Sequence, residues 1–194
     1  ESKNTLVLHA GDAMTGTLYY TLFEGVADAK LMNQIKFDAT TLGNHEFDGG
    51  NKVLKKYLTA LDIPVVSANV TPDETSELKG EWAPYIIKKV GGEQVGIIGL
   101  VVVGKTVASS NPGKDLKFED ERIATQKAVE ELTAKGINKI ILLSYACESP
   151  DTIKSIPGTS FAISRFISYP RWESKIILFT PLACNSATVL WAAA

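Results

Sequence analysis

Short apolar runs alternate with helical patterns along the first three quarters of the chain. Strand-like runs are expected at residues 5–10, 38–43, 63–70 and 138–144, and helical patterns at 18–35, 51–61 and 121–135. In the segment 51–61, apolar residues recur at spacings of three and four, which places them on one face of a helix. The alternation of the two patterns is typical of a layered α/β domain.

Glycines mark where several of these elements end. Gly25 interrupts the helical pattern at 18–35, and Gly136 ends the one at 121–135. Gly91-Gly92 separates YIIKKV from EQVGIIGL and predicts a hairpin over 85–100, because both positions of a primed turn need a positive φ. A charged loop, SSNPGKDLKFEDE, follows the hairpin. We therefore expect an α/β fold with mixed β-sheets flanked by helices, incomplete at both ends.

The last quarter of the chain has a different character. Residues 148–194 hold only three of the 22 acidic residues, are rich in Ser, Pro and aromatic residues, and lack clear periodicity. We expect one domain over 1–147 and an atypical tail over 148–194. The tail is either an irregular cap packed on the same domain or a stretch of unreliable sequence.

Composition limits the classes of function. With 194 residues, 45% hydrophobic and 22% charged, the chain suits a single globular domain. A net charge of -2 gives no support for nucleic-acid binding, which needs a basic surface. No apolar run approaches the ~18 to 20 residues of a membrane span. The first residues, ESKNTL, look like the start of a mature or truncated chain and not like a native terminus with Met. The oligomeric state is not predicted.

Polar residues follow the expected strands directly. Asp12 follows the first strand and Asn44-His45-Glu46 the second, Ser67 and Asn69 follow the run IPVV of the third, and Ser144-Tyr145 ends the fourth. Ligand sites of α/β folds collect beyond the carboxyl ends of strands, so these residues are candidates for one site. A plainer interpretation also stands, because Gly-Asp is often a turn and Asn-His-Glu can be a helix-capping loop.

The residue types favour metal-assisted phosphate chemistry. Asp12 and Asn44 offer hard oxygen donors for a divalent cation such as Mn, Mg or Zn. His45 can ligate, stabilise a developing oxyanion or protonate a leaving group, and Asp48, three positions later, can hold the imidazole in its useful tautomer. His9, inside an apolar strand, is expected to be a packed core residue.

Several segments together carry a family resemblance. LHAGDAMTGTLYYTLFEG, DATTLGNHEFDGG, IPVVSANV, VGIIGL and NPGKDLKFEDE resemble the amino-terminal catalytic domain of the 5′-nucleotidases, within the calcineurin-like metallophosphoesterases. The resemblance covers residues 4–146 and is strongest to the bacterial periplasmic or surface-exposed branch, which includes NAD-degrading nucleotidases.

The resemblance implies a function and a set of roles. It implies hydrolysis of nucleoside 5′-phosphates or nucleotide anhydrides such as NAD with two divalent ions (Zn, Mn or Mg), a nucleotide or phosphate ligand, and a periplasmic or cell-surface location. Asp12 would bridge the two metals and Asn44 would ligate one of them. His45 and Asp48 would form the catalytic pair.

The chain also departs from the family pattern. No Asp-x-His motif precedes Asp12, Tyr145 stands where the family has a metal-binding histidine, and residues 146–194 contain no histidine. These departures imply weak metal binding and little hydrolysis by the chain as written. Three hypotheses stay open: a fragment of a metal-dependent 5′-nucleotidase, a non-catalytic relative that binds nucleotide, phosphate or a protein, and a structural domain without a small-molecule site.

Overall fold

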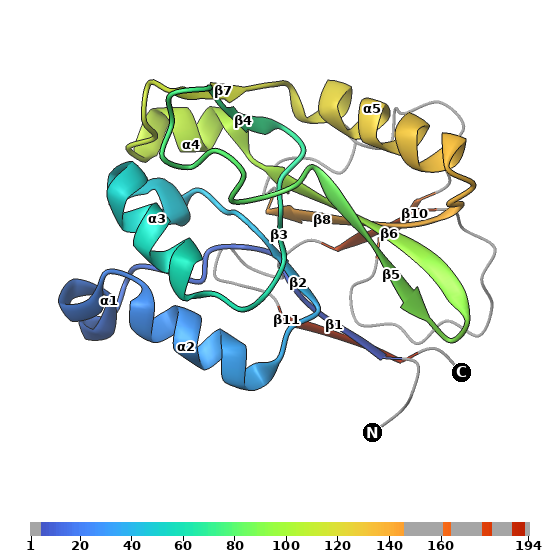
Figure 1. The fold of residues 1–194 in the computed structure, drawn as a ribbon, viewed down its shortest axis with the longest axis horizontal. Helices are drawn as coiled ribbons and strands as arrows, with labels where there is room; N and C mark the ends of the chain where they lie inside the picture. Colours follow the sequence, from blue (N-terminus) through green and yellow to red (C-terminus); the bar gives the residue numbers. More distant parts are fainter. Residues whose placement is uncertain (1–4, 146–160, 164–175, 180–187, 193–194) are drawn as a thin grey trace.

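Two β-sheets pack face to face, and helices cover the outer face of each (Figure 1). The computed structural model describes residues 5–145 and three short segments, 161–163, 176–179 and 188–192. Both sheets contain parallel and antiparallel pairs. The expected α/β class with mixed sheets flanked by helices is confirmed.

The first sheet has the strand order β11-β1-β2-β3. Strands β1 (Thr5–His9), β2 (Ala39–Thr41) and β3 (Val65–Val66) are parallel, and β11 (Thr188–Ala192) runs antiparallel to β1. Helices α1 (Leu18–Phe23), α2 (Val26–Ile35) and α3 (Gly50–Ala60) lie between these strands in the chain. The break between α1 and α2 falls at Gly25, whose φ of 87° lies in the left-handed region that favours glycine.

The second sheet has the strand order β5-β6-β8-β10-β9. The hairpin of β5 (Tyr85–Val90) and β6 (Glu93–Val101) is confirmed, and Gly91 and Gly92 both have a positive φ. The parallel strands β8 (Lys139–Tyr145), β10 (Ile176–Phe179) and β9 (Phe161–Ile163) continue it. Helix α5 (Glu121–Ala134) covers its outer face; it begins at the N-cap Asp120, whose side chain accepts from two backbone N–H groups.

Alternate residues of β8 enter two different apolar cores. Ile140 and Leu142 pack under α5, whereas Ile141 and Leu143 lie in the core between the two sheets. Both faces of the strand are buried, which explains its continuous apolar run. The sheets lie in close contact at Gly99, where an added Cβ would lie 2.1 Å from the carbonyl oxygen of Val66.

The single strand expected at 63–70 is wrong, because the chain bends between two shorter strands. Asn69 donates to the carbonyl of Val101 and accepts from its N–H, at 2.8 and 2.9 Å, which ties the bend to the end of β6. Beyond the bend, β4 (Val70–Pro72) pairs antiparallel with β7 (Leu116–Phe118), inside the segment expected to be a charged loop. Helix α4 (Val103–Ser109) was also not expected.

Three strands, β9, β10 and β11, fall within the tail, while the other tail residues lie outside the described part of the chain. The division into a domain over 1–147 and a tail over 148–194 stays a prediction. Among the described helices, none combines the length and apolar character needed to cross a bilayer.

Candidate functional site

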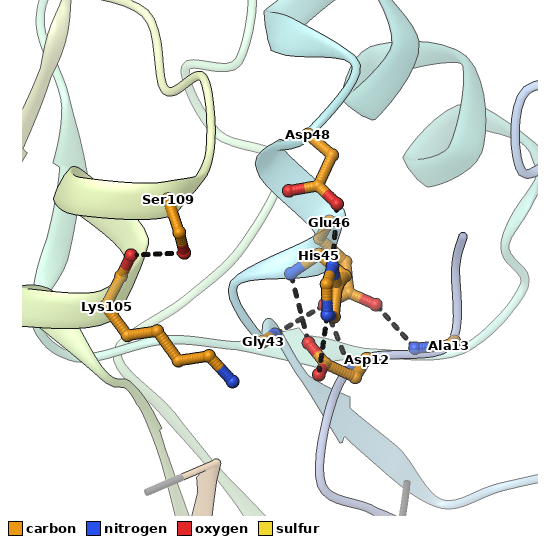
Figure 2. A network of polar contacts seen from close by, with 8 residues as sticks. All are labelled: Asp12, Ala13, Gly43, His45, Glu46, Asp48, Lys105 and Ser109. Atoms are coloured by element: carbon orange, nitrogen blue, oxygen red, sulfur yellow. Dashed lines mark hydrogen bonds and ion pairs between the residues drawn. The ribbon is translucent and has the colours of Figure 1, made fainter. Parts of the chain in front are cut away.

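The candidate site lies where two loops meet at the carboxyl ends of β1 and β2 (Figure 2). The first loop carries Gly11 and Asp12, which have φ values of 90° and 59°. The second carries Gly43 and Asn44. A Cβ added at position 11 would lie 2.5 Å from the Gly43 nitrogen, and a Cβ added at position 43 would lie 2.1 Å from Asp12 Oδ1. Glycine is therefore required at both positions for the loops to touch.

A 3₁₀ turn, η1 (His45–Phe47), follows β2 and brings His45 and Asp48 together. Side chains three positions apart eclipse one another in this conformation. The Asp48 Oδ2 atom lies 2.6 Å from His45 Nδ1, within hydrogen-bonding distance. This contact favours a proton on Nδ1 and so leaves Nε2 to face the other loop.

The second imidazole nitrogen faces Asp12. His45 Nε2 lies 3.9 Å from Asp12 Oδ2, and the His45 backbone N–H donates to Asp12 Oδ1 at 3.0 Å. The His45 side chain is 40% exposed, whereas that of Asp12 is 3% exposed. The imidazole is thus accessible to a ligand, while the Asp12 carboxylate lies deeper beneath it.

Asn44 is buried at the same place, and its amide oxygen has an unusual environment. The residue is 1% exposed, and Oδ1 has no hydrogen-bond partner within the part of the chain that the structure describes. A buried acceptor left unpaired is unfavourable by about 1 to 3 kcal/mol. A divalent cation prefers such oxygens, so the Asn44 amide and the Asp12 carboxylate fit part of a metal site.

Within the described part of the chain, a full set of ligands for two metals is not brought together. Among residues 5–145 and the three described segments, no group of three or more His, Cys, Asp or Glu side chains is placed to hold a metal. Tyr145, the residue at the histidine position of the family pattern, ends β8, and its side chain lies outside the described part.

Glu46 is the residue of this site that sequence reasoning left without a role. Its carboxylate is buried and accepts three backbone N–H groups, from Asp12 at 2.9 Å, Ala13 at 2.7 Å and Gly43 at 2.6 Å. Burial and the nearby Asp12 carboxylate raise the pKa of Glu46 to about 7, while the three N–H donors oppose that rise. Two of the donors lie 33 and 34 residues away in sequence, so no local pattern points to them.

The other candidates at strand ends are Asn69, Ser67 and Ser144. The amide of Asn69 is engaged by the Val101 backbone, so Asn69 does not join the site. Ser67 and Ser144 are buried.

Figure 2 shows the ammonium group of Lys105, on α4, directed toward Asp12 and His45. His9 is 5% exposed, as expected of a core residue.

Comparison with known proteins gives a consistent result. The family model described as calcineurin-like phosphoesterase matches residues 1–151. A probable 5′-nucleotidase of Treponema pallidum is 56% identical over 161 residues, covering 80% of this chain and 27% of the relative. An NAD 5′-nucleotidase of Haemophilus influenzae is 60% identical over 144 residues, covering 74% and 24%.

Solved structures agree with these relatives. The structure of the Haemophilus influenzae NAD nucleotidase superposes with a TM-score of 0.73 at 58% identity, covering 77% of this chain and 26% of that one. A 5′-nucleotidase precursor of Thermus thermophilus superposes with a TM-score of 0.71 at 48% identity, covering 75% and 28%. The chain therefore spans about a quarter of the length of these relatives.

Proposed function

The chain belongs to the calcineurin-like phosphoesterase family, and on this basis we propose that it forms part of the catalytic domain of a metal-dependent 5′-nucleotidase. The proposed substrates are nucleoside 5′-phosphates or nucleotide anhydrides such as NAD. Support for this substrate class comes from the named activities of the similar proteins of Haemophilus influenzae and Treponema pallidum.

One observation carries the proposal: an accessible imidazole is set between two carboxylates. His45 contacts Asp48 through Nδ1 at 2.6 Å and faces Asp12 through Nε2 at 3.9 Å. In a helix-capping loop, side chains would turn back to satisfy backbone donors of the next helix. Here the N-cap of α3 is Gly49, which makes no side-chain cap, and neither Asn44 nor Asp48 caps the turn η1 through its side chain.

Each residue has a role in phosphoryl transfer. Asp12 and Asn44 would hold divalent ions, which when bound supply Lewis-acid activation of water and neutralise phosphate charge. When its ring carries a proton on both nitrogens, His45 donates a hydrogen bond from Nε2 to a phosphoryl oxygen and stabilises the charge that grows there in the transition state. Asp48 accepts the hydrogen bond from Nδ1–H and holds the ring of His45 in that orientation.

The proposed roles separate when Asp12 and His45 are replaced in turn. With added Mn²⁺, the wild-type chain should release phosphate from AMP and should cleave the anhydride of NAD to AMP and nicotinamide mononucleotide. Asp12→Ala should lose both the bound metal and the activity, whereas His45→Ala should lose activity and keep most of the metal. Asp62→Ala, which removes an exposed carboxylate that contacts Asn33, is the matched control and should lose neither. Equal loss of metal in the Asp12 and His45 variants contradicts the assigned roles.

A second candidate function is binding without catalysis: the chain would be a non-catalytic relative that binds nucleotide, phosphate or a protein partner. It is supported by the set of donors. Asp12 and Asn44 supply two ligands, fewer than two metals need, and the described residues offer no cluster of three or more His, Cys, Asp or Glu side chains. This function predicts that the chain releases no phosphate from AMP when Mn²⁺ or Zn²⁺ is added. It also predicts that calorimetry detects binding of AMP or phosphate.

Location and domain organisation complete the proposal. We propose a periplasmic or cell-surface protein, by similarity to the 5′-nucleotidases and to a structure described as that of a precursor. We also propose that the tail packs on the domain formed by residues 1–147, supported by the pairing of β10 with β8 and of β11 with β1. Cell fractionation tests the location, and limited proteolysis tests the packing.

A further inference from the structure

We propose that Glu46 is a positioning residue, whose buried carboxylate fixes the loop of Asp12 against the loop of Asn44 and His45. The inference rests on the proposed function, because the geometry it fixes is that of the candidate metal ligands. Glu46 itself lies beneath the site and acts through other residues: its oxygens face backbone amides and point away from solvent (Figure 2).

The hydrogen bonds of Glu46 join the two loops directly. Oε2 accepts from Asp12 and from Gly43, so one oxygen atom bridges the two loops. Oε1 accepts from Ala13, the next residue of the first loop. A carboxylate has about four acceptor positions on its two oxygens and can satisfy all three donors at once.

A second hydrogen bond returns in the opposite direction. Asp12 Oδ1 accepts the backbone N–H of His45, so each loop offers a carboxylate to amides of the other. Together, the three bonds that cross between the loops set their distance and rotation. They resemble the reciprocal arrangement of a helix capping box, except that the paired residues lie 33 and 34 positions apart.

The backbone at Asp12 needs such support. Its φ of 59° lies in the left-handed region, which is unfavourable for residues other than glycine, although Asp tolerates it better than most. A conformation of this kind persists when the surrounding structure over-determines it. The N–H groups of both Asp12 and Ala13 are held by Glu46, which fixes the peptide that orients the Asp12 side chain.

An apolar or amide side chain would not reproduce this arrangement. An apolar residue of similar size would leave three buried N–H groups without an acceptor. Glutamine has one acceptor oxygen, and its NH₂ group would face a backbone N–H that also needs an acceptor. Aspartate keeps the charge but is one methylene shorter. Glu46→Gln and Glu46→Asp should therefore both shift Asp12 relative to Asn44.

The test compares Glu46→Gln and Glu46→Asp with Leu132→Ala in the full chain. Leu132 lies on the buried face of α5 in a separate core, so its truncation lowers stability without touching either loop. Mn²⁺ affinity is measured by calorimetry and electron paramagnetic resonance, and the melting temperature is measured without metal. Changes to residues that orient metal ligands typically lower metal affinity about 10- to 100-fold, and we expect this loss in both Glu46 variants.

The outcomes separate positioning from general stability. Weaker Mn²⁺ binding in the Glu46 variants, with wild-type binding in Leu132→Ala at a similar melting temperature, supports the proposal. Wild-type affinity in a folded Glu46→Gln, or an equal loss in Leu132→Ala, overturns it. A wild-type chain that binds no Mn²⁺ contradicts the proposed function and the positioning role together, whereas binding that is insensitive to Glu46 contradicts the positioning role alone.

A measurement on the wild-type chain covers the case in which neither Glu46 variant folds. The amide protons of Asp12, Ala13 and Gly43 should be protected from hydrogen exchange in the metal-free protein, although all three lie in loops. Exchange of these protons at the rate of open loops would show that Glu46 does not hold them, and would overturn the proposal.

Discussion

Acidification should destabilise the protein through His9. The imidazole packs edge-on against Phe37, at 5.3 Å between ring centroids, and its Nδ1 accepts the backbone N–H of Gly11 at 3.2 Å. Thr40 Oγ1 also lies 3.2 Å from Nδ1. Burial lowers the pKa of His9 from 6.5 to about 4. A proton on Nδ1 would face the Gly11 N–H, so the native state holds the neutral ring.

The sign and size of the effect follow from proton linkage. Between pH 6.5 and pH 4 the unfolded state binds a proton that the native state does not, so stability is present above pH 6.5 and is lost as the pH falls. The difference between 6.5 and about 4 corresponds to roughly 3 kcal/mol, at about 1.36 kcal/mol for each pH unit. From pH 7.5 to pH 5 the loss is about 2 kcal/mol.

The assay is urea unfolding of the wild type and of His9→Asn at pH 7.5 and pH 5. The Asn amide oxygen can accept from Gly11 but does not titrate in this range. Glu46, whose pKa burial raises to about 7, favours the native state as the pH falls, but it is present in both proteins and cancels in the comparison. The wild type should lose about 2 kcal/mol more than the variant. Equal losses in the free energy of unfolding of the two proteins would refute the claim that His9 is buried in its neutral form.

Two further predictions concern the site. Asp48→Asn replaces a charged acceptor of His45 by a neutral one, so kcat at saturating Mn²⁺ should fall about 10-fold while metal content is unchanged; an unchanged kcat contradicts the orienting role. Gly43→Ala places a methyl group 2.1 Å from Asp12 Oδ1 and should lower both Mn²⁺ affinity and the free energy of unfolding, the latter by about 1 to 3 kcal/mol. Gly104→Ala, which meets no atom within 4 Å, is its control, and equal behaviour of the two alanine variants would contradict the close contact of the loops.

Local signals in the sequence predict the elements that depend on neighbouring residues. Gly91 and Gly92 adopt the positive φ that a two-residue hairpin requires, and Gly25 breaks the helical segment where its pattern is interrupted. The contact between His45 and Asp48 is also local, because three positions along a 3₁₀ turn place two side chains on one side.

Features that depend on distant residues were not predictable in this way. The bend between β3 and β4 exists because Asn69 binds the backbone of Val101, 32 residues away. The role of Glu46 depends on amides of Asp12 and Ala13, which sit on another strand end. The pattern of apolar and polar residues specifies faces of helices and strands, but not which backbone amide will meet a given side chain across the fold.

The most direct test of the proposed function is anomalous scattering from crystals of the protein grown with Mn²⁺. We predict an anomalous peak at ligand distance, about 2.0 to 2.6 Å, from both the Asp12 carboxylate and the Asn44 amide oxygen. His45 Nε2 should face the same space, as it does beside Asp12. A map without a peak beside Asp12 and Asn44, at Mn²⁺ concentrations that saturate binding, would contradict the metal-dependent phosphohydrolase.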